Sequence, residues 1–581
     1  MRFDLQNYKI ITDEENHRKE REVFYMKKLI ALLLVASMTF SLAACATESE
    51  SDVPDTEEVK SNDIASGKYE WPLRSEVVPD DSRTSTANSD KQYDSINVAV
   101  SSVPADLSPY TMSNAITNME IFDTLVEQDE NGEYVGRIAK NWYEKDDTHF
   151  IVELYDYVFD TDGNNITASD VAFSFDTFAN SGFARDFNYY DSCNVIDEYT
   201  VEFVWKEPIT GLTNLASMLT KTYICSEKAY TDHDFVNDPV GSGPYSVRDY
   251  VTSSYVVLEA KDDYWQTDES LEAPNAARNV KTIRYDFISD NSMSAVAFEN
   301  GDTINVALNA DTIELFEEGG EYADLGNLYC YPDTVSITAV PNMSSDSLMS
   351  DLNLRLAVFY ALDTEAFADA LGARLYSPVT TDASPAIADY SNTWTDEENY
   401  QNVYDPELAA EYLKKSDYNG ETLTILLEAN DQKSSIAAVM QAYLDAVGIK
   451  TEITTYDHAM IAGYASMSDG WDIFLASSGD AEYTANRIRK VYGSNAGYAK
   501  GLNISLYEND EFQKMIDNAN TIEGNSESAT QKILDYIYDN ALGYGTAYVV
   551  NVECYSKCVA RIVNKYGNIE IIYGACDYYL D

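Results

Sequence analysis

The side chains that most often carry protein chemistry, histidine and cysteine, are few and scattered in this sequence. The histidines show neither a His-Glu-x-x-His pattern nor any other spacing that would place two ligands on one metal ion. Cys554 and Cys558 lack the Cys-x-x-Cys spacing and have no histidine nearby, so a zinc site is not indicated. We expect no metal and no cofactor. The histidines are His17, His149, His233 and His458, and the cysteines besides Cys45 are Cys193, Cys225, Cys330, Cys554, Cys558 and Cys576.

Motifs for nucleophilic catalysis and phosphate binding are also missing. The sequence contains no Gly-x-Ser-x-Gly elbow and no Gly-x-x-x-x-Gly-Lys loop, which points away from an enzyme. A hydrolase that uses paired carboxylates stays open, because among 99 Asp and Glu residues some pair will always be close. The six cysteines besides Cys45 could form up to three disulfides, with a pairing that sequence alone does not decide.

The acidic excess limits the partners. The formal charge of −60 argues against nucleic acid and against an anionic lipid surface. It mildly favours cationic or zwitterionic ligands, although a solvated surface explains it as well.

The region 422–478 has a strand–helix–strand–helix–strand pattern. Strands are predicted at 422–430, 449–455 and 471–477, and helices at 434–448 and 457–468. This order implies parallel strands joined by right-handed crossovers, and the ligands of such sheets lie beyond the carboxyl ends of the strands. Asp480 lies just past such an end, in "SSGD". A loop or helix-cap carboxylate is the alternative for Asp480.

Other elements follow from local signals. We expect strands at 95–102, 149–155 and 245–251, and a helix over 114–127. "DTDG" at 160–163 is predicted as a hairpin turn rather than a calcium loop, because its glycine is fourth rather than sixth. Thr167 or Asp170 caps a further helix. Asp351, Asp363 and Asp405 are predicted N-caps, Gly372 ends the second of these helices, and Gly241 and Gly243 supply backbone freedom.

The N-terminal region has the layout of a secretory signal peptide. Lysines precede an apolar run, and small residues precede Cys45, so that 26–45 reads as a lipoprotein signal peptide in which "LAAC" resembles the bacterial lipobox. An ordinary signal or a membrane anchor is the alternative. The charged segment 1–25 fits no signal and is interpreted as a mis-called start. The segment 46–94 is too polar to pack a core and is predicted to be a disordered tether.

Several segments, taken in order, resemble the extracytoplasmic solute-binding proteins of ABC transporters, in the peptide/nickel-binding family 5. They are "LSPY", "IFDTLVE", "VFDTDGNNITASDVAFSFDTF", "PVGSGPY", "DDYW", "LNLRLAVFYALD" and "YDPELAAEYL", spread from about Ser95 onwards. The resemblance implies an α/β, two-lobed, periplasmic-binding-protein-like (type II) fold with an inserted subdomain. Lobe I would comprise 95–133, 226–310 and 542–581, the inserted subdomain 134–225, and lobe II 311–541.

The resemblance also implies site residues. In peptide-binding members, an aspartate after the strand that corresponds to "WDIFLAS" holds the ligand's α-ammonium group, and Asp480 matches it. The tryptophan and proline that usually flank this aspartate are absent here, so Glu482 is a rival anchor. Asn114 and Ile116 match a segment that lies along the peptide. Tyr110 and Trp471 are candidate wall residues, with the hydrophobic core as the alternative for each.

The function that follows is a lipid-anchored binding component of an ABC importer. We expect a monomer outside the cytoplasmic membrane, held by Cys45, that captures short peptides between its lobes and delivers them to the permease subunits. Oligosaccharide and metal chelate are alternative ligands, and a secreted hydrolase is the alternative of another class.

Overall fold

The structure is a computed structural model of the 581-residue chain. It describes residues 77, 79–80, 82–101, 106–110, 120–128, 134–146, 148–181, 190–206, 219–268, 271, 273–372, 375–387, 389–395, 403–478, 483–494, 503–521, 523–563 and 571–580. The described α-helices are α3 (Ala168–Asn180), α5 (Glu227–Asp232), α6 (Asn291–Glu299), α7 (Ile313–Phe316), α8 (Leu352–Tyr360), α9 (Thr364–Leu371), α10 (Pro406–Lys415), α11 (Asp431–Ala446), α12 (His458–Ala465), α13 (Thr484–Tyr492), α14 (Asp510–Ala519) and α15 (Glu527–Asp539).

A four-stranded sheet joins the start of the described chain to its middle. Its order is β1 (Tyr93–Val100), β10 (Val280–Phe287), β9 (Tyr255–Ala260) and β8 (Tyr245–Val251). β1 and β10 are parallel, whereas the other pairs are antiparallel. Alternate residues of β1, Ile96 and Val98, are buried in a core that also receives Tyr555 and Tyr578 from near the end of the chain. The predicted strands at 95–102 and 245–251 are confirmed, and the first begins two residues earlier.

A second four-stranded sheet, all antiparallel, is built from residues 139–205. Its order is β4 (Ala139–Asp146), β5 (His149–Leu154), β7 (Thr200–Trp205) and β6 (Tyr190–Asp197). α3 packs on it through Val171 and Phe175, which share a core with Phe203. Thr167 is the N-cap of α3 in a capping box with Asp170, so both predicted cap residues take part. A hairpin of β2 (Val126–Gln128) and β3 (Tyr134–Gly136) lies before this sheet in the sequence.

The helix expected over 114–127 is wrong in its described part. Glu120 and Ile121 are helical, but the chain leaves the helix at Phe122 and enters β2 at Val126. The reason is tertiary: the Asp123 carboxylate is buried and accepts hydrogen bonds from Arg137, Tyr264 and Trp265. These contacts hold the backbone at Asp123 extended, in a bridge with Ile224, although the apolar spacing of the segment fits a helix.

Glycine is needed for different physical reasons in two turns. Gly163 in "DTDG" has a positive φ of 77°, and the turn is held by the Asp160 carboxylate, which accepts from the backbone N–H groups of Asp162 and Asn164. The predicted turn is therefore confirmed. Gly241 and Gly243 do not adopt a positive φ; a Cβ at either position would collide with the backbone of Ile121. Close approach of two chain segments, rather than backbone freedom, is what glycine permits there.

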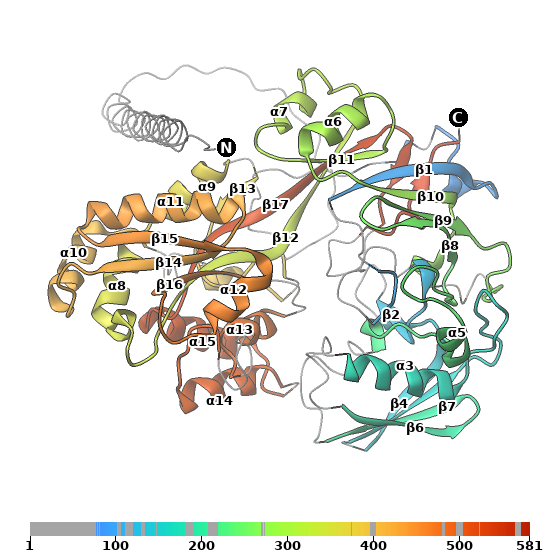
Figure 1. Ribbon diagram of the computed structural model, residues 1–581, viewed down its shortest axis with the longest axis horizontal. Coiled ribbons are helices and arrows are strands. Elements are labelled where there is room, and N and C mark those ends of the chain that lie inside the picture. Colours follow the sequence, from blue (N-terminus) through green and yellow to red (C-terminus); the bar gives the residue numbers. More distant parts are fainter. Residues whose placement is uncertain are drawn as a thin grey trace, which may run out of the picture. The chain divides into compact units, whose positions relative to one another are not determined.

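The largest sheet has seven strands and contains the predicted parallel unit. Figure 1 shows its two long strands, β12 (Gly326–Pro341) and β17 (Tyr544–Ser556), running side by side. The sheet order is β11 (Asn305–Leu308), β17, β12, β16 (Ile473–Ser478), β14 (Thr422–Glu428) and β15 (Lys450–Tyr456), and β13 (Tyr376–Pro378) also pairs with β17. β14 is parallel to both β15 and β16, as predicted. β17 pairs in this sheet with β12 and β13, which lie in the predicted lobe II (311–541). The predicted domain boundaries, however, assign 542–581, and with it β17, to lobe I; those boundaries stay predictions.

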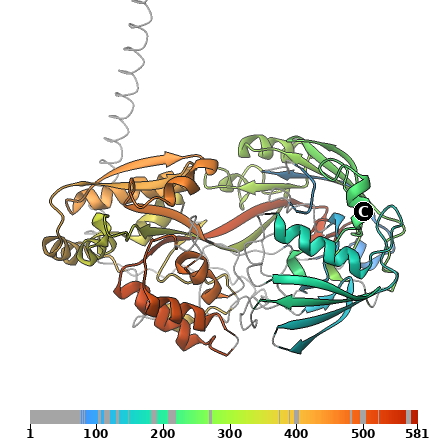
Figure 2. The ribbon, with the colours of Figure 1, turned by 60° about the horizontal axis from the view of Figure 1, so that its bottom comes forward.

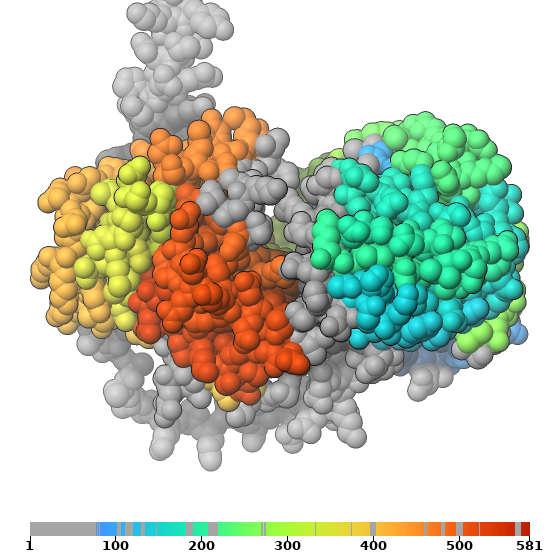
Figure 3. All heavy atoms as spheres, turned by 90° about the horizontal axis from the view of Figure 1, so that it is seen from below, coloured from blue at the N-terminus to red at the C-terminus, as the bar shows by residue number. Residues whose placement is uncertain are grey.

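Helices cover both faces of the parallel strands (Figure 1 and Figure 2). Leu423, Ile425 and Leu427 of β14 face a core with α8, α9, α10 and α11, whereas Leu426 faces a core with α12, α13, α14 and α15. Strands that are buried on both faces read as near-continuous apolar runs, which is why "TLTILLE" could be recognised. The exposed side of α14 and α15 forms the orange-red surface in Figure 3.

The predicted helix caps are confirmed. The side chains of Asp351, Asp363 and Asp405 accept hydrogen bonds from backbone N–H groups at the starts of α8, α9 and α10, and Gly372 ends α9 with φ of 111°. All six cysteines of the described ranges are free thiols. β18 (Val559–Arg561) and β19 (Asp577–Tyr578) form a further antiparallel pair. None of the helices in the described ranges has both the length and the apolar composition that crossing a bilayer requires.

Candidate functional site at the carboxyl ends of the parallel strands

The three parallel strands end at one edge of the large sheet, and polar or aromatic residues mark each end. β14 ends at Glu428, whose carboxylate lies 3.1 Å from the Nζ atom of the buried Lys433. β15 ends at Tyr456, whose ring stacks on that of Tyr464 with centroids 3.7 Å apart. β16 ends at Ser478. Ligands of open α/β sheets bind at such an edge, so this is the candidate site.

The end of β16 is held by the neighbouring antiparallel strand. Ser336 of β12 is the register partner of Ser478, and the pairing continues without a shift to Pro341 opposite Ile473. The last residue before the predicted anchor segment therefore has a defined partner on the central strand of the sheet.

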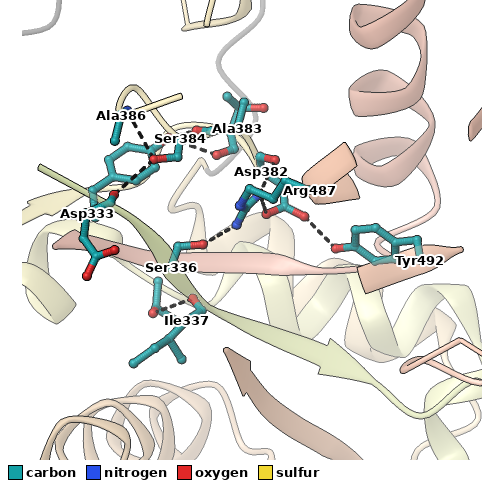
Figure 4. Close-up of polar contacts among 12 residues, drawn as sticks. Asp333, Ser336, Ile337, Asp382, Ala383, Ser384, Ala386, Arg487 and Tyr492 are labelled. Carbon is teal, nitrogen blue, oxygen red and sulfur yellow. Dashed lines mark hydrogen bonds and ion pairs between the residues drawn. The ribbon is translucent and has the colours of Figure 1, made fainter. Parts of the chain in front are cut away.

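α13 follows that segment and packs deeply against the same edge. Seven of its nine residues are buried, among them Arg487 and Tyr492. Figure 4 shows that the Arg487 guanidinium lies between Ser336 and Asp382. Its NH1 group donates to the carboxylate of Asp382 at 2.8 Å and to the backbone carbonyl of the same residue at 2.6 Å. Its NH2 group donates to the Ser336 hydroxyl.

The carboxylate of Asp382 holds two side chains of α13 at once. One oxygen accepts from Arg487, and the other accepts from the Tyr492 hydroxyl at 2.8 Å. Arg487 is 1% exposed and Asp382 is 4% exposed, so the pair is removed from water, and the Arg487 Nε has no hydrogen-bond partner among the described residues. Burial, followed by the nearby Asp382 charge, holds the pKa of Tyr492 well above its usual range, and its phenol is a permanent donor.

A second carboxylate from the same loop caps α13. Tyr483 occupies the N-cap position but makes no side-chain cap hydrogen bond. Instead, Asp389 accepts from the backbone N–H of Thr484 at 2.8 Å and from its hydroxyl at 2.9 Å. Burial raises the pKa of Asp389, and the two hydrogen bonds from Thr484 oppose that rise. The loop of residues 382–389 thus binds α13 at its start, middle and end.

A pocket of about 520 Å³ lies beside this cap, between 389–394 and the start of α15. Glu527 of α15 accepts hydrogen bonds from the hydroxyls of Ser391 (2.6 Å) and Thr393, which lower the pKa of its carboxyl group. Neither Asp389 nor Glu527 forms an ion pair with a cation of the described part of the chain, so the pocket carries negative charge. The lining residues are Asp389, Tyr390, Ser391, Asn392, Thr393, Trp394, Asn525, Ser526, Glu527 and Thr530.

The structure describes two of the predicted ligand-binding residues, and both lie in cores. Tyr110 is 4% exposed, and its hydroxyl contacts the Tyr223 carbonyl and the Cys225 sulfur. Trp471 is 3% exposed and donates from Nε1 to the Met467 carbonyl. Both residues thus lie in the hydrophobic core, which the sequence had left open as the alternative to a ligand-binding wall. Outside the described residues lie Asp480, Glu482, Asn114, Ile116 and the predicted lipidation residue Cys45.

Sequence reasoning missed Asp382, Arg487 and Tyr492. A signal for Arg487 was available: Thr484, Ile488 and Val491 recur at helical spacing, and Arg487 falls on that same face. A charged residue on an apolar helix face calls for a buried partner. Asp382 had no such signal, because its loop carries no periodic pattern. Within the described ranges, no group of three or more His, Cys, Asp or Glu side chains is arranged to hold a metal ion.

Comparisons with known proteins give a consistent result. The family model for bacterial extracellular solute-binding proteins, family 5 Middle, matches residues 133–499. The glutathione-binding protein GsiB of Salmonella paratyphi A is 24% identical over 437 residues, which cover 71% of this chain and 80% of GsiB. The nickel-binding protein NikA of Staphylococcus aureus is 23% identical over 449 residues, covering 73% and 82%. The oligopeptide-binding protein AppA of Bacillus subtilis, solved in complex with a nonapeptide, superposes with a TM-score of 0.66 at 18% identity, covering 84% of this chain and all of AppA.

Proposed function

Because the chain belongs to family 5 of the bacterial extracellular solute-binding proteins, we propose that it captures short peptides outside the cytoplasmic membrane and delivers them to an ABC permease. The family consists of substrate-binding components of ABC importers, and its members bind peptides or small molecules rather than catalyse reactions. The fold is the α/β, two-lobed type II periplasmic-binding-protein fold that the sequence predicted.

One observation carries the peptide proposal. β16 ends at Ser478, at the carboxyl edge of a doubly covered parallel sheet, where open α/β sheets bind their ligands, and Asp480 follows two residues later in the sequence. An ammonium group that leaves water needs a countercharge, and a carboxylate at a strand end supplies one. Asp480 is proposed as the anchor of the peptide's α-ammonium group, with Glu482 as the rival. Asn114 and Ile116 are proposed to lie along the peptide.

The electrostatics of the described residues favour a ligand with a positive group. The pocket beside the start of α13 carries Asp389 and Glu527 without an ion-paired cation from the described part of the chain. The whole chain has a formal charge of −60. A zwitterionic peptide meets this requirement through its amine, whereas a neutral oligosaccharide gains nothing from it.

Two alternatives have specific support. A metal chelate as ligand is supported by the similarity to the nickel-binding protein of S. aureus. An oligosaccharide is supported by the 12% aromatic content, including 45 tyrosines, because aromatic rings can stack on sugars. Many tyrosines of the described ranges are buried in the hydrophobic core, however, and are not available for such stacking. A secreted hydrolase remains the alternative of another class, and only the abundance of carboxylates supports it.

The lipid anchor is proposed from sequence. The "LAAC" motif ends a signal-like run at Cys45, and the polar segment after it would serve as a tether. Lipidated Cys45 would hold the monomeric binding protein at the outer face of the cytoplasmic membrane, near the permease subunits.

Native mass spectrometry of the protein purified from its own host tests the ligand class directly. We expect a co-purified peptide whose mass is lost on denaturation. A released peptide should then rebind unchanged after prolonged incubation, since a binding protein returns its ligand intact. A sugar or a metal chelate in the bound mass would replace the peptide proposal, and cleavage of the added peptide by pure protein would replace binding by hydrolysis.

A further inference from the structure

The chain that joins β16 to α13 is held at both ends by one residue of the central strand. Ser336 pairs with Ser478, where β16 ends, and its hydroxyl accepts a hydrogen bond from Arg487, one turn into α13. The segment 479–483 lies between these two points in the sequence. A shift of α13 along β12 would therefore move the C-terminal end of this segment relative to its N-terminal end.

Asp382 holds Arg487 and Tyr492 in one arrangement. Its backbone carbonyl and one carboxylate oxygen bind Arg487, while its second carboxylate oxygen accepts from Tyr492. These bonds have fixed directions, so α13 cannot rotate or slide by one residue without breaking several of them (Figure 4). Asp389 adds a fourth contact at Thr484.

Stability alone does not explain such a network. A buried ion pair is often no more stabilising than well-packed apolar residues of similar volume, because both charges must be desolvated. The Arg487 Nε, which finds no hydrogen-bond partner in the described part of the chain, adds a further cost. Apolar residues would hold α13 as strongly, but apolar contacts are not directional and would leave its register less strictly defined.

We propose that Ser336, Asp382, Arg487 and Tyr492 are positioning residues that set the register of α13 on β12 and thereby place the ligand's ammonium anchor, which the sequence puts between β16 and α13. This inference rests on the proposed function for the identity of the anchor. It assigns no ligand contact to the four residues themselves. Their effect on binding is transmitted through the position of α13.

Two conservative variants and two matched controls test this role in the full chain. Ser336→Ala and Tyr492→Phe each remove one hydroxyl of the network. Thr546→Val removes a buried hydroxyl that donates to the Ile337 carbonyl, and Tyr544→Phe removes one that donates to the Leu362 carbonyl. Tyr492 and Tyr544 are 1% and 2% exposed, so this pair is closely matched in burial. All four variants should lower the thermal midpoint by similar amounts.

The first readout is hydrogen exchange in peptides that cover α13, without ligand. Ser336→Ala and Tyr492→Phe should accelerate exchange there by roughly fivefold or more, the equivalent of one lost hydrogen bond, whereas the controls should not. If all four variants exchange alike in α13, the network is merely structural and the inference is overturned.

The second readout is the ratio of the dissociation constants of N-acetyltrialanine and trialanine, measured by calorimetry. The wild-type ratio should be large, and it should fall in Ser336→Ala and Tyr492→Phe but not in the controls. If the wild-type ratio is large, its full retention in both network variants would overturn the positioning role. A wild-type ratio of one, together with altered exchange in the two network variants, would uphold the register role of the network and reject the amine anchor of the proposed function.

Discussion

The hydroxyl of Tyr285 donates a 2.6 Å hydrogen bond to the carboxyl group of Glu120, and both side chains are buried. The other carboxyl oxygen accepts from the backbone N–H of Gly574 at 3.2 Å. No lysine, arginine or histidine of the described residues forms an ion pair with Glu120. Burial raises the pKa of Glu120 from 4.5 to about 7, against the opposing effect of these two hydrogen bonds.

This pKa predicts how stability depends on pH. Between pH 4.5 and 7 the folded protein keeps a proton at Glu120 that the unfolded chain releases, so the free energy of unfolding falls as pH rises through this window. The contribution is about 3 kcal/mol, because each pKa unit is worth 1.36 kcal/mol. Glu120→Gln should therefore be more stable than the wild type at pH 8 and similar to it at pH 4. Urea unfolding at both pH values measures the difference in the free energy of unfolding. If this free energy falls by the same amount from pH 4 to pH 8 in both proteins, another group is responsible.

The buried triad of Arg137, Asp123 and Glu127 should be essential for stability. Arg137 lies 2.5 Å from Asp123 and 2.9 Å from Glu127, and all three side chains are buried. Arg137→Met would leave two buried carboxylates without a cation, which typically costs about 3–5 kcal/mol. We expect a large drop in the thermal midpoint.

The pair of Lys145 and Glu202, at 2.6 Å, is the control for the triad, because its lysine side chain is 55% exposed. Lys145→Met should leave the thermal midpoint nearly unchanged, because solvent reaches this lysine and screens the ion pair. If Arg137→Met is as mild as Lys145→Met in differential scanning calorimetry, the triad does not stabilise this part of the fold.

The proposed ammonium anchor makes a quantitative prediction about binding. Removing one member of a buried charge pair costs about 2–5 kcal/mol, so Asp480→Asn should weaken the binding of a verified peptide ligand by roughly 30-fold to several thousand-fold. N-acetylation of that peptide should cost about as much, and the two losses should not add, because they remove the same contact. Calorimetry on the four combinations completes the cycle.

Glu482→Gln is the comparison for this cycle. If Asp480→Asn binds like the wild type while Glu482→Gln fails, the anchor is Glu482. Acetylation that changes nothing in any of these proteins would remove the main support for a peptide ligand.

Lipidation at Cys45 predicts the location of the protein in cells. The wild type should be found in the membrane fraction and should incorporate a labelled fatty acid. Cys45→Ser should stay uncleaved and unlabelled, because the cysteine is the residue that would be modified. A cysteine in the described part, such as Cys193, provides the control: Cys193→Ala should keep the label. Labelling of Cys45→Ser would disprove the lipobox interpretation.

Local sequence signals determined much of the architecture. The apolar runs of β14 and β16, the helix periodicity of α11 and the caps at Asp351, Asp363 and Asp405 all lie within short segments, so each could be predicted from a few residues. The order of those segments also determined the parallel pairing and the edge where a ligand would bind, because crossover connections have one allowed hand. The family resemblance followed from other short segments, such as "PVGSGPY" and "YDPELAAEYL".

Contacts between distant residues were decided only by the tertiary structure. The extended backbone at Asp123 depends on Arg137, Tyr264 and Trp265, and it overrides the helical spacing of its own segment. Asp382 meets Arg487 more than 100 positions further along the chain, and Ser336 meets it from 151 positions away. Such a partner is chosen by which elements the sheet brings together, and no local pattern encodes it. Desolvation of buried groups such as Glu120 arises in the same way, since it is a property of the assembled core rather than of the residue.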